Sequence, residues 1–220
     1  MQQENRLHSE LINNFKRGRV LKFDKGEIIL QAKDIPQGIY LIDKGFVQVY
    51  SISDEGDENI HIIYKAGEVF PLIWAFNNIT RDVFYQAISP CQLYLLSKED
   101  FLAAVHDLHE MSNAVILQLT EQFRVFADRL ENLEYGDAFE RVVYRLLFLA
   151  SRFGEKSRHK IIINAPITHQ RIADSINLVR ETVSREIEEL EKQKIISHRG
   201  RKIVINDIKG LQKLVGFGYN

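Results

Sequence analysis

Four polar residues whose side chains can recognise nucleic-acid bases fall within six positions: Arg180, Glu181, Ser184 and Arg185. A guanidinium can donate two parallel hydrogen bonds to N7 and O6 of guanine, and a carboxylate can accept one from N4 of cytosine. If the segment is helical, its residues turn by about 100° each, and the four share an arc of about 140°. They could therefore face the edges of base pairs in one groove together.

The residues around these four predict two short helices joined by a tight turn. The stretch THQRIADSI would be capped by Thr168 and would end before Asn177, a residue type that tolerates the left-handed backbone of a sharp turn. The inward-facing residues would be Ile172, Ala173 and Ile176 in the first helix and Val183, Ile187 and Leu190 in the second. This is the pattern of a helix-turn-helix, which places the first turns of its second helix in the major groove.

A basic hairpin follows the two helices. The stretch IISHRGRKIVIN indicates a strand, an Arg-Gly turn and a second strand, with Arg199, Arg201 and Lys202 at the tip. Such a wing could clamp DNA phosphates, although the alternative is an ordinary solvated hairpin. We interpret the later charged residues of the second helix as a solvated face: Glu186, Glu189, Glu191, Lys192 and Lys194.

Charge is distributed unevenly along the 220 residues, although the net charge is only −1. Residues 1–155 hold 16 Lys and Arg against 23 Asp and Glu, a balance of −7, and residues 156–220 hold 13 against 7, a balance of +6. An acidic front and a basic end favour two domains, of which the second suits a polyanion. One cysteine, no visible secretory signal and no apolar stretch long enough for a bilayer favour a cytoplasmic setting without a membrane partner.

A long helix is predicted from about His109 to Tyr135. Its apolar residues alternate at spacings of three and four, and they form an apolar seam of Ile116, Leu119, Phe123, Phe126, Leu130 and Leu133. Strict alternation favours a coiled-coil dimer interface with a second copy of the chain. The alternative is a helix packed on its own domain, and the two uses can coexist on different faces.

A break follows the long helix. Gly136 interrupts the pattern and makes this point a candidate hinge, while Asp137 and Glu140 resemble a capping box that starts another helix. Upstream, residues from about 20 to 98 predict short strands with regular turns, as in an antiparallel barrel or sandwich. The predicted fold class is α+β: an N-terminal antiparallel, jelly-roll-like β-barrel, a long dimerisation helix and a C-terminal winged helix-turn-helix domain.

The stretch ITHQRIADSINLVRETVSREIEELEKQKII resembles the DNA-binding motif of the Crp/Fnr family of transcription regulators. The resemblance covers nearly the whole chain. In that family the positions matching Arg180, Glu181 and Arg185 contact base edges, and Ser184 matches a serine used by the Fnr-like branch. The resemblance thus implies a homodimer that binds double-stranded DNA and recruits or blocks RNA polymerase.

The resemblance also implies phosphate contacts at Thr168 and Gln170. Val179 departs from the capping Ser or Thr that is usual there, which can cost about 1 kcal/mol of stability. The domains would be a sensor barrel like a cyclic-nucleotide-binding domain (residues 1–108), the dimerisation helix and hinge (109–136) and the DNA-binding domain (137–220). The operator would be a palindrome with TGA-containing half-sites about one helical turn apart.

The front domain departs from a cyclic-nucleotide site. Such sites hold the ribose with a Glu and the cyclic phosphate with an Arg-Ser/Thr pair. The matching stretch GEVFPLIWAFNNITRDVFYQA keeps Glu68 and Arg81, but Phe70 replaces a small residue and Asp82 replaces the hydroxyl. A carboxylate repels an anionic phosphate. We therefore expect no control by cyclic AMP and name Glu68, Trp74, Arg81 and Asp82 as a candidate pocket for an unknown effector.

Two alternatives to this regulator stay open: a constitutive regulator without an effector, and one that responds to a cyclic nucleotide. An enzyme is not predicted, because none of the hydrolase, phosphate-loop or metalloprotease motifs is present. His106 and His109 have helical spacing but no third ligand nearby, and a single Cys91 cannot hold an iron–sulfur cluster. No metal and no cofactor are therefore predicted.

Overall fold

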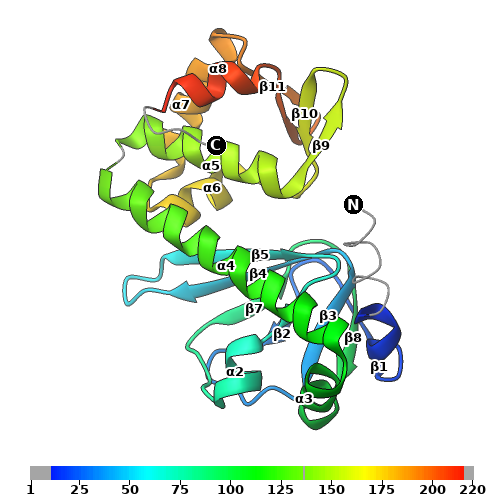
Figure 1. Ribbon diagram of the computed structural model, residues 1–220. Coiled ribbons are helices and arrows are strands. Elements are labelled where there is room, and N and C mark those ends of the chain that lie inside the picture. The colour runs from blue at the N-terminus through cyan, green and yellow to red at the C-terminus, as the bar shows by residue number, and fades with distance from the viewer. Residues whose placement is uncertain (1–10, 136, 216–220) are drawn as a thin grey trace. The chain divides into compact units, whose positions relative to one another are not determined.

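The computed structural model describes residues 11–135 and 137–215 (Figure 1). They belong to two compact units, Met1–Arg124 and Val125–Asn220, which divide within one long helix. The first unit contains β1 (Arg19–Phe23), β2 (Ile28–Leu30), β3 (Ile39–Lys44), β4 (Phe46–Ile52), β5 (Glu58–Lys65), β6 (Val69–Phe70), α2 (Leu72–Asn77), β7 (Phe84–Ala87), β8 (Cys91–Leu96), α3 (Lys98–Asp107) and the start of α4 (His109–Tyr135). Helix α4 has the predicted bounds, while the candidate hinge residue Gly136 lies outside the described residues.

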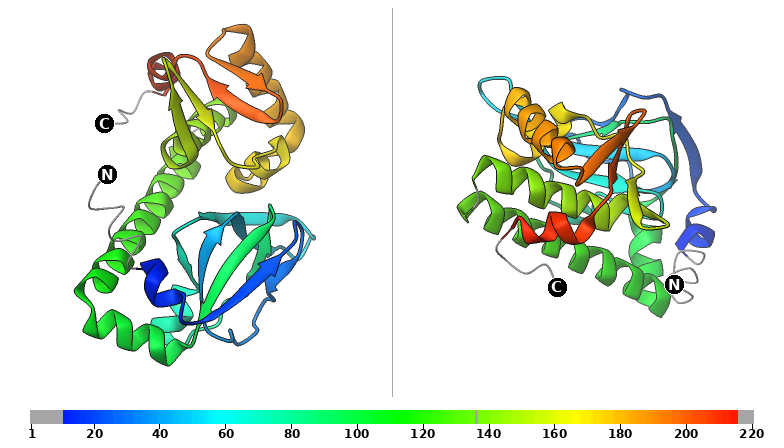
Figure 2. Two further views of the ribbon diagram at one scale, coloured as in Figure 1. Left: turned by 90° about the vertical axis from the view of Figure 1, so that its right-hand side faces the viewer. Right: turned by 90° about the horizontal axis from the view of Figure 1, so that it is seen from above.

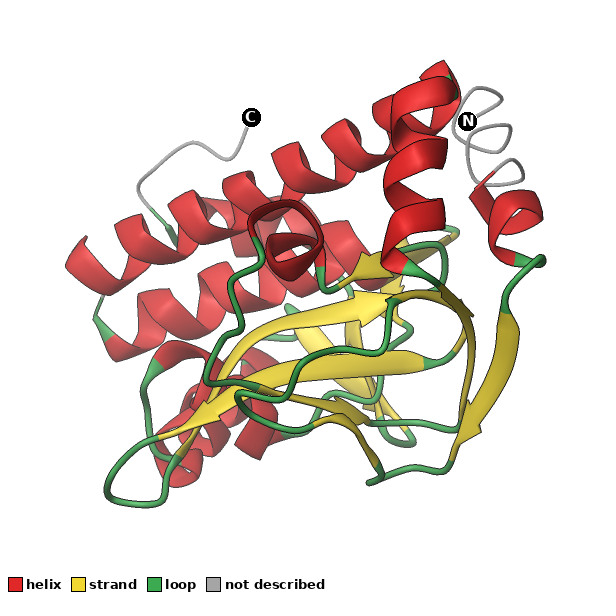
Figure 3. Ribbon diagram, turned by 90° about the horizontal axis from the view of Figure 1, so that it is seen from below, coloured by secondary structure: helices red, strands yellow, loops and turns green. Residues whose placement is uncertain are grey.

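The strands of the first unit form two four-stranded antiparallel sheets, in the orders β1-β8-β3-β6 and β2-β7-β4-β5 (Figure 3). The predicted antiparallel, jelly-roll-like β-domain is confirmed, but the sheets do not close into a barrel, since no pairing among the described residues joins one sheet to the other. The edge strand β6 has only two residues, and Pro71 follows it. Proline has no N–H to continue the hydrogen-bond ladder, so strand β6 ends there. Period-two alternation along short strands cannot distinguish this arrangement from a barrel.

Apolar side chains from both sheets fill the space between them. At its centre lies an aromatic cluster, which consists of Tyr40, Tyr64, Phe70 and Tyr85. The ring centroid of Phe70 lies 5.3 Å from that of Tyr40, 5.6 Å from that of Tyr64 and 5.0 Å from that of Tyr85. Phe70 is fully buried, and burial raises the pKa of Tyr85 to about 12. Stacked aromatic pairs stabilise beyond their buried area, so this cluster ties the two sheets together.

A second apolar cluster packs helices against the first sheet. Met111 and Val115 of α4 are buried there with Ile39 and Leu41 of β3. The side-chain amide of Gln118 fixes α4 to the edge strand: Nε2 donates to the carbonyl of Val69 at 2.7 Å, and Oε1 accepts from its N–H at 2.9 Å. This amide bracket satisfies backbone groups of a strand too short to pair fully.

The second unit continues from α4 with α5 (Ala138–Phe153), β9 (Gly154–Ser157), β10 (Lys160–Ile163), α6 (His169–Ile176), α7 (Arg180–Lys192), β11 (Ile196–Arg199), β12 (Lys202–Ile205) and α8 (Ile208–Lys213). Its four strands form one antiparallel sheet in the order β9-β10-β12-β11. The predicted capping box is present at the start of α5: Asp137 accepts from the Glu140 N–H, and Glu140 accepts from the Asp137 N–H. Helix α5 packs against α6, α7 and α8 and buries Leu146 and Leu149 completely (Figure 2).

Candidate nucleic-acid interface

The predicted helix-turn-helix consists of α6 and α7. The Thr168 side chain caps α6 by accepting from the Arg171 N–H at 3.2 Å. Asn177 ends the helix in the left-handed conformation, with φ of 53°, and its N–H donates to the Ala173 carbonyl. Asn adopts this conformation more readily than most residues, which lets the chain turn sharply into α7. The predicted turn is confirmed.

Helix α7 separates an inward from an outward face. The inward residues, Val183, Ile187 and Leu190, are fully buried. On the outward face Arg180, Glu181 and Arg185 are exposed, and Ser184 is half-buried. The predicted division of faces is therefore confirmed. Three buried apolar side chains at helical spacing supply enough apolar area to fix the rotation of the helix.

The first turn of α7 lacks a side-chain cap. Val179 occupies the N-cap position, makes no side-chain hydrogen bond to the helix and is 62% exposed. The first N–H groups of a helix have no intrahelical acceptor, and the helix dipole places partial positive charge there. The missing cap is what the departure at Val179 led us to expect, and it leaves this end of α7 in an environment that favours an anion.

Arg185 is held by its neighbour. Its Nη2 lies 2.9 Å from Oε1 of Glu186, and its Nε donates to the same oxygen at 3.1 Å. The Glu186 side chain is only 15% exposed, so the interpretation of Glu186 as a solvated residue is wrong. Glu186 lies about 240° round the helix from Arg180, at the edge of the inward face. Arg180 and Glu181, in contrast, form no side-chain hydrogen bond or ion pair within the described part of the chain.

The candidate phosphate-binding residues lie on α6 and the wing. Thr168 and Gln170 are exposed, and the Gln170 amide donates to Asp174 at 2.7 Å. The wing is the predicted hairpin, β11 and β12, and Arg199, Arg201 and Lys202 at its tip are all exposed. Gly200 occupies the turn with φ of 60°, a conformation that glycine adopts without strain. All three charged side chains thus lie outside the protein core, and the Lys202 ammonium also donates to the side-chain oxygen of Asn164.

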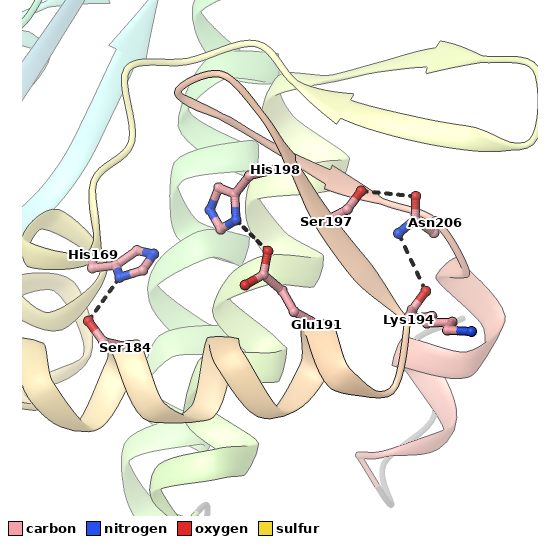
Figure 4. Close-up of polar contacts among 7 residues, drawn as sticks. All are labelled: His169, Ser184, Glu191, Lys194, Ser197, His198 and Asn206. Carbon is pink, nitrogen blue, oxygen red and sulfur yellow. Dashed lines mark hydrogen bonds and ion pairs between the residues drawn. The ribbon is translucent and has the colours of Figure 1, made fainter.

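Sequence reasoning missed two polar contacts, one between α6 and α7 and one between α7 and the wing (Figure 4). The ring of His169 contacts the Ser184 hydroxyl, and the ring of His198 contacts the Glu191 carboxylate. Glu191 is therefore not simply solvated, as we had interpreted it. The signal available in the sequence was His169 itself, placed next to the capping Thr168. Its partner Ser184 is 15 residues away, and only folding brings the two together.

The candidate effector residues of the first unit do not converge on one open site. Trp74 and Arg81 both line a cavity of about 20 Å³, whereas Glu68 and Asp82 do not. The Glu68 carboxylate accepts from the Lys65 N–H at 2.8 Å, and Asp82 forms an exposed ion pair of 2.9 Å with Lys33. A cavity of this size holds about one water molecule.

Neither a metal-binding cluster nor a membrane-spanning helix is found in the described part of the chain. There, no three side chains of His, Cys, Asp or Glu gather as a metal ion would require. His106 instead lies 2.8 Å from Asp107, and Cys91 is buried with its thiol donating to the Phe46 carbonyl. No helix in the same residues combines the length and apolar character of a membrane span.

Comparisons with known proteins agree with this architecture. A family model described as a cyclic nucleotide-binding domain matches residues 20–107, and one described as a Crp-like helix-turn-helix domain matches residues 140–214. The global nitrogen regulator of Synechococcus elongatus is 28% identical over 86% of this chain and 87% of its own. The fumarate and nitrate reduction regulatory protein of Yersinia pestis is 25% identical over 87% and 76%.

Solved structures show the same fold. FixK2 from Bradyrhizobium japonicum superposes with a TM-score of 0.78 at 23% identity and covers 91% of this chain and 98% of its own. The two family models cover separate parts of one chain, in the order in which the two units follow each other. The chain therefore belongs to the Crp/Fnr family of DNA-binding transcription regulators, whose members are not enzymes.

Proposed function

We propose that the protein is a homodimeric, sequence-specific regulator that binds a palindromic operator with TGA-containing half-sites. The observation that carries the proposal is the outward face of α7, where Arg180, Glu181 and Arg185 are exposed beside a basic wing. These side chains, with Ser184, contact base edges in the major groove. Thr168, Gln170, Arg199, Arg201 and Lys202 contact phosphates and set the position of α7 on the duplex.

The dimer forms through the apolar seam of α4. Phe123 is 76% exposed and Leu130 is 67% exposed, and Ile116, Leu119 and Phe126 are exposed as well. The side chain of Leu133 lies outside the described residues. The seam is rotated by about 90° from the face of α4 that carries Met111 and Val115, so packing on the sheet leaves it free. A row of exposed apolar side chains on a helix is typical of an interface.

The first unit does not bind a cyclic nucleotide. Phe70 and the rest of the aromatic cluster fill the space between the sheets, and Asp82 stands where a hydroxyl would meet the phosphate. A different effector would contact Trp74 and Arg81, which share the small cavity, together with Glu68 and Asp82, which lie outside it. A constitutive regulator and a cyclic-nucleotide-responsive one are the alternatives. Calorimetric titration measures the affinity for cyclic AMP and cyclic GMP. Micromolar binding of either nucleotide would contradict the proposal.

The remaining assignments follow from the family. Residues 1–108 are the sensor domain, 109–136 the dimerisation helix and hinge, and 137–220 the DNA-binding domain. The dimer works in the cytoplasm, where it recruits or blocks RNA polymerase. An effector would act by reorienting the two DNA-binding domains about the end of α4.

The operator is identified by selecting bound sequences from random DNA, followed by competition in a gel-shift assay. Arg185→Ala should cost about 1–3 kcal/mol of binding free energy and relax the preference at one base pair of each half-site. Lys192→Ala removes the same charge from the other end of α7 and serves as the control. If Arg185→Ala kept the full operator preference, the assignment of α7 would be wrong.

Sedimentation tests the dimer. Phe123→Glu places a charge in the centre of the seam and should convert the dimer to a monomer. Leu117→Glu is the matched control, because Leu117 is an exposed apolar residue of the same helix that points about 145° away from the centre of the seam. A Phe123→Glu variant that sedimented like the control would contradict the proposed interface.

A further inference from the structure

The side chain of His169 contacts a proposed base-contacting residue. Its Nδ1 lies 2.9 Å from the Oγ of Ser184 (Figure 4). His169 is the first residue of α6, Ser184 lies in the second turn of α7, and both are half-buried. The histidine lies between two exposed residues proposed to contact phosphates, Thr168 and Gln170. One hydrogen bond therefore links the entry of α6 to the outward face of α7.

This hydrogen bond can run in either direction, and the direction matters for DNA. A serine hydroxyl has one O–H to donate and lone pairs to accept. When neutral His169 carries its proton on Nε2, Nδ1 accepts the Ser184 O–H, and only the Oγ lone pairs are left for a base. When His169 is protonated, Nδ1–H must donate, and the Ser184 O–H is released toward the groove.

The two states suit different base edges. An Oγ that can only accept pairs with the amino groups of adenine N6 and cytosine N4. A released O–H pairs with base-edge acceptors: guanine N7 and O6, thymine O4 or adenine N7. Guanine and thymine, which have no major-groove donor, are thus bound by the Ser184 hydroxyl only when His169 is protonated.

The surroundings of His169 determine when it takes up the proton. The facing groups are Ser184, Arg180, Glu188 and Glu191 of α7 and His198 of β11, whose ring centroid lies 5.8 Å from that of His169. Burial lowers the pKa of His169 below its ordinary value of 6.5, with smaller lowering effects from His198 and Arg180; Glu191 and Glu188 oppose them. His169 is therefore neutral at pH 7 and takes up a proton only in a more acidic medium.

His198 is itself held in place. Its Nδ1 lies 2.7 Å from Oε1 of Glu191, at the far end of α7, so the wing strand is tied to the helix that carries Ser184 (Figure 4). The His198 ring contributes to the lowered pKa of His169. The contacts of the two rings thus connect α6, α7 and the wing.

We propose that His169 is a positioning residue that sets the hydrogen-bonding direction of Ser184, and thereby makes the base preference of the protein depend on pH. The proposal rests on the proposed function of α7. In neutral and alkaline medium Ser184 selects a base-edge donor, adenine or cytosine. In acidic medium the released O–H also pairs with base-edge acceptors, so the preference moves toward guanine or thymine.

The test compares two operators that differ only at the base pair nearest Ser184, at about pH 8 and about pH 5.5. The ratio of the affinities of the protein for the two operators, taken at the same pH, cancels any general effect of pH on DNA binding. In the wild type the ratio should change by about 2-fold to 10-fold in favour of the base-edge acceptor on acidification, which is the range of one net hydrogen bond.

Variants separate this mechanism from a purely structural role. His169→Gln keeps an amide that can hydrogen-bond but does not titrate, so the ratio should no longer depend on pH; Ser184→Ala should have the same effect. His198→Gln removes the neighbouring charge and should move the midpoint of the change to higher pH. His159→Gln, an exposed histidine in the turn between β9 and β10, is the matched control and should behave as the wild type.

Nitrogen-15 NMR of the imidazole groups gives a second readout in the free protein, without DNA. It should show the Nε2–H tautomer for His169 at about pH 8 and a pKa that rises in His198→Gln. A wild-type ratio that did not change with pH, or a His169→Gln variant that kept the change, would overturn the inference and leave the regulator intact. Failure of the wild type to bind selected DNA at either pH would overturn the proposed function and the inference together.

Discussion

The two units use their polar side chains in opposite ways. In the first unit the side chains that match a ligand site are engaged within the protein: Glu68 holds a turn, and Asp82 pairs with Lys33. In the second unit Arg180 and Glu181 are exposed, and α7 begins without a side-chain cap. The comparison teaches that side chains at matching positions of a shared fold can be left available for a partner or can be used in contacts within the protein.

Phe70 shows how packing bears on the proposed absence of a cyclic-nucleotide site. Its ring is fully buried between the sheets and stacks on three tyrosines, where a small residue would leave space. Chain fold alone therefore does not establish the ligand of the first unit.

The largest effect that tests this contrast comes from Phe70→Ala. We expect the first unit to lose about 3–5 kcal/mol of unfolding free energy, because a fully buried ring leaves a cavity between the sheets. Urea denaturation followed by the fluorescence of Trp74, the single tryptophan of the chain, reports on this unit. Phe76→Ala, at a 43% exposed position, is the control and should cost much less. A loss below about 1 kcal/mol for Phe70→Ala would show that the aromatic cluster is not a structural core.

A smaller loss is expected from Gln118→Leu, which keeps the size of the side chain but removes the amide bracket on Val69. Two backbone groups of β6 lose their partner, and leaving a buried polar group unsatisfied costs about 1–3 kcal/mol. The same fluorescence measurement gives the change. Thr120→Ala, two residues along α4, removes only a hydrogen bond within the helix and is the control. Equal stabilities of the two variants would contradict a role for the bracket.

Val179→Ser should instead stabilise the second unit. A serine at this N-cap position can accept from an N–H of the first turn of α7, which contributes about 1 kcal/mol. Thermal unfolding followed by circular dichroism measures the gain. Val179→Ala provides the baseline, since it shortens the exposed side chain without adding an acceptor. If both substitutions raised the midpoint equally, the missing cap would not limit the stability of α7.

The smallest effect is expected from Asp82→Asn. The ion pair with Lys33 is exposed on both sides, and pairs of this kind contribute little to stability. The pKa of Lys33 is raised by its hydrogen bond with Asp82, so the pair is formed at neutral pH. We expect no measurable change in the urea midpoint, with Asp57→Asn in the β4–β5 turn as the control. A clear loss of stability would mean that Asp82 does more than pair on the surface.

The features that the sequence predicted correctly in both units depend on short separations along the chain. The capping box joins Asp137 to Glu140, three residues apart, and the turn at Asn177 follows from its own backbone preference. The closed barrel was predicted wrongly because short alternating strands specify which side chains face inward but not which edges pair. Glu186 was assigned to solvent because its charge outweighed its place at the border of the inward face.

The sequence by itself determined the family, the helix-turn-helix, the wing and the outward face of α7, because these depend on local spacing and residue type. The tertiary structure decided that Phe70 joins Tyr40, Tyr64 and Tyr85, that Gln118 brackets Val69, and that His169 meets Ser184. The Gln118–Val69 contact spans 49 residues, whereas Tyr64 and Phe70 lie on consecutive strands and His169 and Ser184 on consecutive helices. Such contacts arise only when the sheets and helices are assembled, since no local preference specifies the partner.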